Sequence, residues 1–169
     1  MVDVVNNVAR QQEDRMPTYT CFTTQGKLTP AQKEEVARVL TDVYLEEFGL
    51  ARYMTQVIFH EIATGDRYIA GKPALPDLVW IRCDVRLGRT EDQKARLLHR
   101  VQQGVAKIAD VSEEAVWIYL DDLPSWNIME WGHIMPPLGA VSDDRALPQD
   151  GNWFEALSSP MQASLQSLA

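Results

Sequence analysis

The sequence TPAQK at residues 29–33 returns as TEDQK at residues 90–94, at an offset of 61 residues. Each copy has the Thr-x-x-Gln form of a capping box, in which both side chains bind free backbone N–H groups at the start of a helix. Pro30 suits the first helical position because its missing N–H would have no partner there. The repeat therefore predicts two helices, over residues 30–48 and 91–109, that begin at the same point of two equivalent units.

Strand-like runs stand before and after each predicted helix. Residues 17–24 and 78–85 come before the helices, and residues 54–61 and 115–122 come after them, again 61 apart. Each unit is therefore a strand, a helix and a strand, and the chain is predicted to be a duplicated βαβ unit.

The two units, residues 17–61 and 78–122, predict an α+β domain in two layers. Because a βαβ crossover places its helix on one face of the sheet, we expect a four-stranded sheet with both helices on the same face. Residues 63–76, between the units, contain closely spaced Gly and Pro and predict a hairpin-like linker.

The two ends of the chain lie outside the repeat. Residues 1–16 have no counterpart in the second unit, and we treat them as an N-terminal extension whose presence in the mature protein the sequence leaves open. Residues 17–169 are predicted to form a single domain, in which residues 123–169 make a C-terminal loop and arm.

The two faces of the predicted sheet differ in polarity. One set of side chains on the second strands is uniformly apolar and suits the helix-covered face: Val57, Phe59, Ile118 and Leu120. The opposite face is expected to hold a mixed but strongly aromatic set: Gln56, Ile58, His60, Trp117, Tyr119 and Asp121, with Tyr19 and Trp80 from the first strands. A monomer would expose too much apolar surface there, so we predict that other copies of the chain cover this face in a closed symmetric oligomer.

The composition is that of a globular domain and argues against several classes of partner. The 169 residues carry a net charge of −8, with 46% hydrophobic and 24% charged residues, and they show no cluster of Lys and Arg of the kind that binds nucleic acid. The sequence has no 18-residue apolar run and no signal-peptide core, and Cys21 and Cys83 fall in strand-like runs where buried thiols are expected. We therefore expect a cytoplasmic protein that binds neither nucleic acid nor membrane.

Few residues remain that could carry chemistry. Metal-ligand spacing, a phosphate loop and a nucleophile elbow are missing from the sequence, so no metal and no cofactor is expected. Arg86 and Arg89 stand just before the helix cap Thr90, where the helix dipole favours a small anion such as a carboxylate. On spacing alone the two arginines could equally pair with nearby acids on a solvated surface. Tyr119 and Glu130 could likewise be an interface aromatic and an ordinary exposed acid.

Five stretches of the chain resemble one known family. They are PTYTCFTTQGKLTPAQK at 17–33, RLGR at 86–89, WIYLDDLP at 117–124, MEWG at 129–132 and GNWFEALSS at 151–159. In these stretches the chain resembles the tautomerase superfamily, with its 4-oxalocrotonate tautomerase-type fold, and within it the cis-3-chloroacrylic acid dehalogenase-like group. The resemblance implies duplicated βαβ units, assembly into a homotrimer, and a catalytic proline that becomes the first residue when the initiator methionine is removed.

The resemblance makes Pro17, which follows Met16, the expected general base and acid. An N-terminal amine is less basic than a lysine, and nearby cations or an apolar pocket lower its pKa further. The implied activity is that of a cofactor-independent tautomerase, which takes a proton from a small unsaturated 2-oxo or enol carboxylic acid and returns it to carbon.

The resemblance also implies roles for five further residues. Arg86 and Arg89 would bind the substrate carboxylate, while Tyr119 and Glu130 would orient or activate a water or a proton-transfer position. Tyr44 stands where the dehalogenase pattern has a histidine that supports the carboxylate, and a phenol brings one hydrogen bond but no charge. We therefore expect a tautomerase or hydratase rather than an efficient dehalogenase.

Residues 1–16 decide between the remaining possibilities. If they stay attached, Pro17 is a tertiary amide with no basic lone pair and no proton to give. The alternatives are a hydrolytic dehalogenase or hydratase of 3-haloacrylate-like acids and, with the extension retained, either an isomerase or cyclase centred on Glu130 or a non-catalytic binding protein.

Overall fold

The computed structural model describes residues 17–48, 55–130 and 133–134. The N-terminal extension and most of the predicted C-terminal loop and arm lie outside these described residues. The first unit consists of strand β1 (Thr18–Thr24), helix α2 (Pro30–Phe48) and strand β2 (Gln56–Ile62). The second consists of strand β5 (Val79–Arg86), helix α3 (Glu91–Ala109) and strand β6 (Val116–Leu123).

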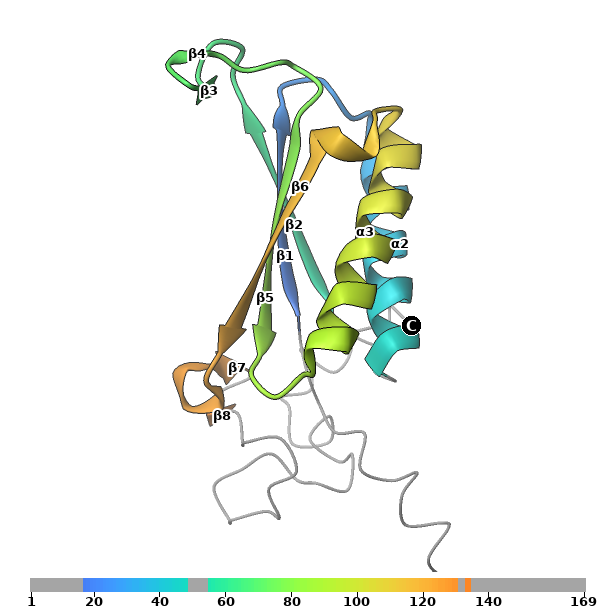
Figure 1. The fold of residues 1–169 in the computed structure, drawn as a ribbon, viewed down its shortest axis with the longest axis vertical. Coiled ribbons are helices and arrows are strands. Elements are labelled where there is room, and N and C mark those ends of the chain that lie inside the picture. The colour runs from blue at the N-terminus through green and yellow to red at the C-terminus, as the bar shows by residue number, and fades with distance from the viewer. Residues whose placement is uncertain (1–16, 49–54, 131–132, 135–169) are drawn as a thin grey trace, which may run out of the picture.

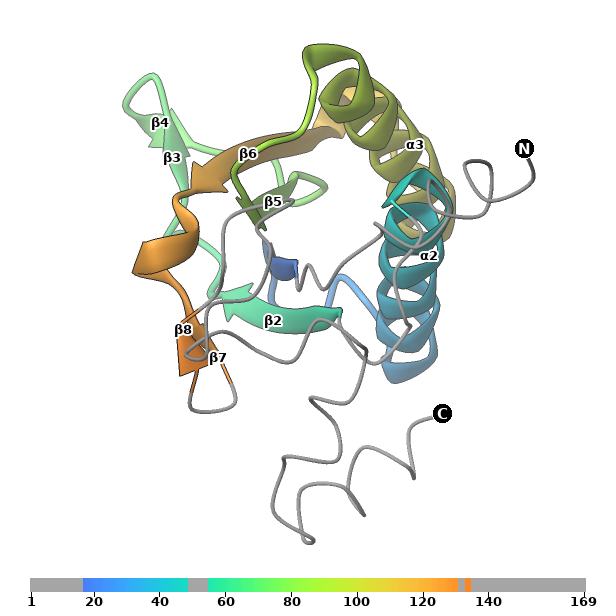
Figure 2. The same cartoon turned by 90° about the horizontal axis from the view of Figure 1, so that it is seen from below.

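The six elements form the predicted two-layer α+β fold. Their four strands make one sheet in the order β2-β1-β5-β6, in which each unit pairs its own strands in parallel while β1 and β5 pair antiparallel at the centre. Both helices cover the same face of this sheet (Figures 1 and 2). The duplicated βαβ architecture is confirmed, and the antiparallel centre makes the two units point in opposite directions.

Short elements mark the two ends of the sheet. The predicted linker hairpin is present as β3 (Tyr68–Ile69) and β4 (Lys72–Pro73), and its turn uses positive φ at Ala70 (52°) and Gly71 (75°), as a type I′ turn requires. After β6 follow a 3₁₀ turn and the pair β7 (Met129–Glu130) and β8 (His133–Ile134). Figure 1 shows the β3–β4 hairpin at one end of the sheet and β7–β8 at the other.

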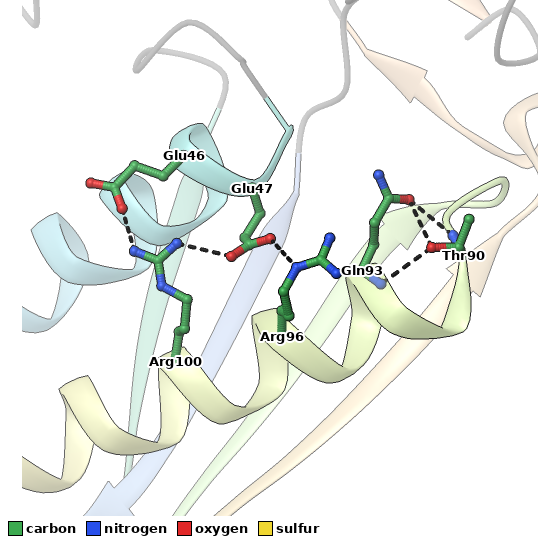
Figure 3. Close-up of polar contacts among 6 residues, drawn as sticks. All are labelled: Glu46, Glu47, Thr90, Gln93, Arg96 and Arg100. Carbon is green, nitrogen blue, oxygen red and sulfur yellow. Dashed lines mark hydrogen bonds and ion pairs between the residues drawn. The ribbon is translucent and has the colours of Figure 1, made fainter.

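The helices begin at the two predicted capping boxes. In the first, the Thr29 backbone N–H donates to Gln32 Oε1 at 3.0 Å and the Gln32 N–H donates to Thr29 Oγ1 at 3.2 Å. Thr90 and Gln93 repeat the same two distances at the start of α3 (Figure 3). Neither helix, nor any other in the described part of the chain, combines the length and the apolar character that crossing a membrane would take.

Ion pairs join the exposed sides of the two helices. Glu47 on α2 accepts from Arg96 Nε at 3.0 Å and from Arg100 Nη1 at 2.9 Å, and Arg100 also pairs with Glu46 (Figure 3). The hydrogen bond from Arg100, followed by that from Arg96, lowers the pKa of Glu47. These contacts link α2 and α3, which lie side by side over the sheet (Figures 1 and 2).

The core between helices and sheet includes one residue that the sequence analysis placed wrongly. Tyr19 was expected on the open face, but its side chain is 0% exposed and its ring meets the ring of Tyr44 edge-on at 6.3 Å. Tyr19 pairs with Val57 across the sheet, and Val57 packs against the core as predicted. Side chains of paired residues point to the same face, so this register places Tyr19 under the helices.

The open face carries the other predicted aromatic residues. Trp80 stacks on Phe22 at 4.6 Å between ring centroids, and Phe22 stacks on His60 at 5.1 Å. Trp117 and Tyr119 are both exposed on the neighbouring strand β6. This surface agrees with the reasoning behind the predicted oligomer, which stays a prediction.

Candidate active site

The topology brings Pro17, which precedes β1, and the end of β5 to the same end of the sheet. Because β1 and β5 are antiparallel, Thr18 at the start of β1 lies opposite Asp84 near the end of β5. Pro17 itself is buried, and its carbonyl accepts a hydrogen bond from the Gln56 N–H at 3.0 Å. Arg86 is the last residue of β5, two residues beyond Asp84, so it lies at the end of the sheet where β1 begins.

Arg86 at the end of β5 and Arg89 in the loop that follows are both buried. Leu87 N–H binds the Leu123 carbonyl at 2.8 Å, and Gly88 has φ 122°, a value that favours glycine. Arg86 and Arg89 are only 3% and 6% exposed. The alternative that both belong to a solvated charged surface is therefore wrong.

Arg89 is enclosed by side chains of α2. Its Nη2 donates to the Tyr44 hydroxyl and its Nη1 donates to the Arg86 carbonyl. The guanidinium carbon lies 4.6 Å from the ring centroid of Phe48 and 5.3 Å from that of Tyr44. Aromatic faces and hydrogen-bond acceptors together offset the cost of burying this charge.

Glu130 is an acid at this end of the sheet whose pKa is raised. It lies on β7, directly beyond the end of β6, and it is partly buried. Burial raises its pKa to about 7, and the positive charge of Arg86 opposes that rise. A carboxyl group with a pKa near neutrality can act as an acid or as a base at physiological pH.

Tyr119 lies elsewhere in the single chain. It pairs with Arg82 across the sheet, four residues before Arg86 on β5, which places it about 13 Å from that end at roughly 3.3 Å per residue. Its ring is 57% exposed and meets Trp80 edge-on at 5.5 Å. The structure therefore gathers Pro17, Arg86 and their neighbours at one end and leaves Tyr119 on the open face.

A pocket of about 280 Å³ adjoins Tyr119 near the β3–β4 hairpin. Its lining is mostly apolar and includes Tyr68, Trp80, Trp117 and Arg67. Arg67 closes one side by donating to the Leu78 carbonyl at 2.6 Å and the Phe22 carbonyl at 3.2 Å. This pocket is separate from the cluster of Arg86, Arg89 and Glu130.

Other chemistry finds little support in the described part of the chain. Residues 17–48, 55–130 and 133–134 contain no group of three or more His, Cys, Asp or Glu that could hold a metal ion. Cys21 and Cys83 are buried free thiols, as expected, and burial raises the pKa of each to about 12. Neither cysteine is suited to act as a nucleophile.

Phe48 is the site residue that sequence reasoning missed. It lies one helical turn beyond Tyr44 on α2, and the two rings are 4.7 Å apart. Spacing of i and i+4 on a helix signalled that both residues share a face. No sequence pattern indicated that this face would meet Arg89, which is 41 residues further along the chain.

The chain matches a family of known proteins over most of its length. The model of the family described as "Putative oxalocrotonate tautomerase enzyme" matches residues 16–147. No curated protein matches the chain. The structure of N1, a member of the cis-3-chloroacrylic acid dehalogenase family, is 30% identical with a TM-score of 0.74, covering 89% of this chain and 99% of that one.

Two further solved structures share the fold. Pt0534 inactivated by 2-oxo-3-pentynoate is 25% identical with a TM-score of 0.64, over 69% of this chain and 94% of that one. A fused 4-OT in an asymmetric trimer is 19% identical with a TM-score of 0.65, over the same shares of the two chains. At 19% identity, the likeness to the fused 4-OT shows only that the fold is shared.

Proposed function

The chain belongs to the tautomerase superfamily, in its cis-3-chloroacrylic acid dehalogenase family, and from that premise we propose that it is a cofactor-independent isomerase. Its substrate is a small unsaturated 2-oxo or enol carboxylic acid, and mature Pro17 is its base and acid. The observation that supports the proposal is that buried Pro17 lies at the end of the sheet where β5 ends, which is also the end that carries Arg86, Arg89 and Glu130.

The reaction is a proton transfer through Pro17. As a free secondary amine, Pro17 takes the proton from the enol oxygen, and the resulting ammonium returns it to carbon, so that the enol becomes the 2-oxo acid. Nearby guanidiniums favour the neutral amine over the ammonium and so lower the pKa of Pro17 toward neutrality. The same cations bind the substrate carboxylate and hold the reacting carbon near the amine.

A solved relative supports the substrate class. Pt0534 is inactivated by 2-oxo-3-pentynoate, which is an unsaturated 2-oxo acid. An unsaturated 2-oxo acid carries the carboxylate that Arg86 would bind and the conjugated carbon next to which a proton would move. The buried arginines of this chain suit such an anion better than a neutral ketone.

A second candidate is hydration or hydrolytic dehalogenation of a 3-haloacrylate-like acid. The raised pKa of Glu130, about 7, favours this reaction. A carboxyl group with this pKa is partly ionised at neutral pH, and its carboxylate form can take a proton from an attacking water. A protonated Pro17 would then donate to carbon, and Tyr119 would orient the water. Tyr119 lies away from this end of its own chain, so that role requires the Tyr119 of a neighbouring copy.

Assembly and location follow as parts of the same proposal. Copies of the chain form a homotrimer that covers the aromatic open face, and the enzyme works in the cytoplasm. A stable monomer in sedimentation experiments would count against the trimer and against the role of Tyr119 in catalysis.

The deciding measurement is the intact mass of the protein isolated from its own cells. A mass that begins at Pro17 gives a free amine and supports the isomerase. A mass that keeps residues 1–16 rules out proline catalysis and leaves an isomerase or cyclase centred on Glu130, or a non-catalytic binding protein. Turnover that survives Pro17→Ala but fails at Glu130→Gln would select the Glu130 enzyme.

A further inference from the structure

Tyr44 has no surface to offer a substrate. Its side chain is 0% exposed on the inner side of α2, between the rings of Tyr19 and Phe48. The family resemblance implies that this position supports the substrate carboxylate directly. Burial on this scale indicates instead that Tyr44 acts through another residue.

That other residue is Arg89. The Tyr44 hydroxyl accepts a hydrogen bond from Arg89 Nη2, and the Arg86 carbonyl accepts one from Nη1. Phe48 and Tyr44 also hold the guanidinium carbon at 4.6 and 5.3 Å from their ring centroids. Two of the three guanidinium nitrogens therefore have fixed acceptors.

The third nitrogen lacks a fixed acceptor in the described part of the chain. Arg89 Nε is buried and has no hydrogen-bond partner among residues 17–48, 55–130 and 133–134. A buried N–H of a charged group that lacks an acceptor is costly, and an anion removes that cost. The remaining donors of the guanidinium form an edge suited to a carboxylate.

We propose that Tyr44 is a positioning residue that fixes the Arg89 guanidinium for carboxylate recognition and does not touch the substrate. The proposal rests on the proposed function for the identity of the anion as a small carboxylic acid. A guanidinium fixed before binding loses less side-chain freedom when the anion arrives. Tyr44 therefore determines preference for an acid over its neutral ester, and it does so only while Arg89 is present.

The test measures binding of two probes to the full chain by calorimetry. The probes are phenylpyruvate, an aromatic 2-oxo acid, and its methyl ester, which lacks the negative charge. Tyr44→Phe keeps the ring and removes the acceptor. Arg89→Leu removes the cation, and Leu28, which occupies the equivalent position of the first unit, shows that leucine can be buried there.

The expected result is a tenfold effect that depends on Arg89. Tyr44→Phe weakens phenylpyruvate binding about tenfold, the scale of one charged hydrogen bond, and changes ester binding less than about twofold. In the Arg89→Leu background, Tyr44→Phe causes no further loss of phenylpyruvate affinity. Tyr19→Phe is the matched control, because Tyr19 is an equally buried phenol that makes no described hydrogen bond to Arg89, and it leaves both affinities unchanged.

Two outcomes overturn the proposal. A tenfold loss that persists in the Arg89→Leu background would show that Tyr44 contacts the ligand directly. An unchanged affinity in the Tyr44→Phe single variant would show that its hydroxyl does not matter for recognition.

A signal that needs no ligand separates this proposal from the proposed function. The ¹⁵N–¹H resonance of the Arg89 guanidinium is expected to broaden in Tyr44→Phe and to stay sharp in Tyr19→Phe. An unchanged signal in Tyr44→Phe overturns the positioning role. If the unsubstituted protein failed to bind phenylpyruvate, the carboxylate substrate would be refuted, while this resonance would still decide whether Tyr44 positions Arg89.

Discussion

At one end of the sheet Arg86 ends β5 and Arg89 lies in the loop that follows, and at the other end the loop after β1 carries Gln25 and Leu28 at the equivalent positions. The helices differ in the same way. Arg89 meets Tyr44 and Phe48 on α2, whereas the equivalent residues of α3 are the small buried side chains of Val105 and Ala109.

The framework around these positions is the same in both units. The capping boxes have equal distances, and the ion pair between Lys33 and Glu61 returns as the pair between Lys94 and Asp122. Duplication therefore supplies a symmetric scaffold, and a few substitutions place two buried arginines at one of its ends where the other end has Gln25 and Leu28. The candidate function lies in the asymmetry.

The largest expected effect concerns the start of the first unit. Pro17→Ala should lower turnover of an enol acid about a thousandfold in the form that begins at residue 17, because it replaces the cyclic secondary amine used for proton transfer. The equivalent residue of the second unit is Leu78, and Leu78→Ala should leave turnover within about twofold. Steady-state kinetics with both variants checks this, and equal losses would place the chemistry outside the Pro17 end.

The second-largest effect is expected for a cation introduced at the buried position of Leu28. Leu28→Arg should lower the free energy of unfolding by about 3 kcal/mol or more, because Val105 and Ala109 offer neither an acceptor nor an aromatic face to the buried charge. Urea unfolding measures the change. Leu28→Met is the control and should cost less than about 1.5 kcal/mol. Similar costs for the two variants would mean that Arg89 does not need its aromatic surroundings.

The third prediction concerns the charge that acts on Glu130. Arg86→Gln installs the residue of the equivalent position and should raise the pKa of Glu130 further above about 7, because the positive charge that opposes the rise is removed. A pH titration of the Glu130 carboxyl by NMR measures it. Arg82→Gln is the control, since Arg82 pairs with Asp84 and Asp121. A lowered or unchanged pKa in Arg86→Gln would contradict the assignment.

The same shift fixes the sign of the pH dependence of stability. The pKa of Glu130 in the folded state lies above its ordinary value. The stability that Glu130 contributes to the folded protein is therefore fully present at a pH below the ordinary pKa, and it is lost as the pH rises through about 7. Arg86→Gln should extend this loss to higher pH.

The smallest effects should be equal in the two units. Thr29→Ala and Thr90→Ala each remove one capping box and should each lower the free energy of unfolding by about 1 kcal/mol. Thr→Ser at each position keeps the hydroxyl and serves as the control. If urea unfolding gave clearly different changes in the free energy of unfolding for the two variants, the two caps would not be equivalent.

Local sequence signals predicted the scaffold well because each needs only a few adjacent residues. The Thr-x-x-Gln boxes gave both helix starts, and alternation gave the helix-covered set of Val57 and Phe59. Tyr19 was misplaced because an aromatic residue near a strand end suits either face, and only the pairing with Val57 decides between them.

The candidate site was predicted only in part. Spacing alone left Arg86 and Arg89 between an anion site and a solvated surface, and the resemblance gave them a role. Their burial depends on how a loop of the second unit packs on a helix of the first. No local pattern encodes that contact, because it depends on the crossing of two distant segments.

The duplication, the helix boundaries and the residue types available for chemistry can all be read from the amino-acid sequence, since capping and alternation act over short distances along the chain. Three features come from the packing of distant segments: the antiparallel centre brings Pro17 to the end of β5, Tyr44 and Phe48 enclose Arg89, and Tyr119 lies apart from them. Local patterns do not predict these features, because burial, charge pairing and the pKa of Glu130 depend on neighbours in space, and these neighbours come from both units.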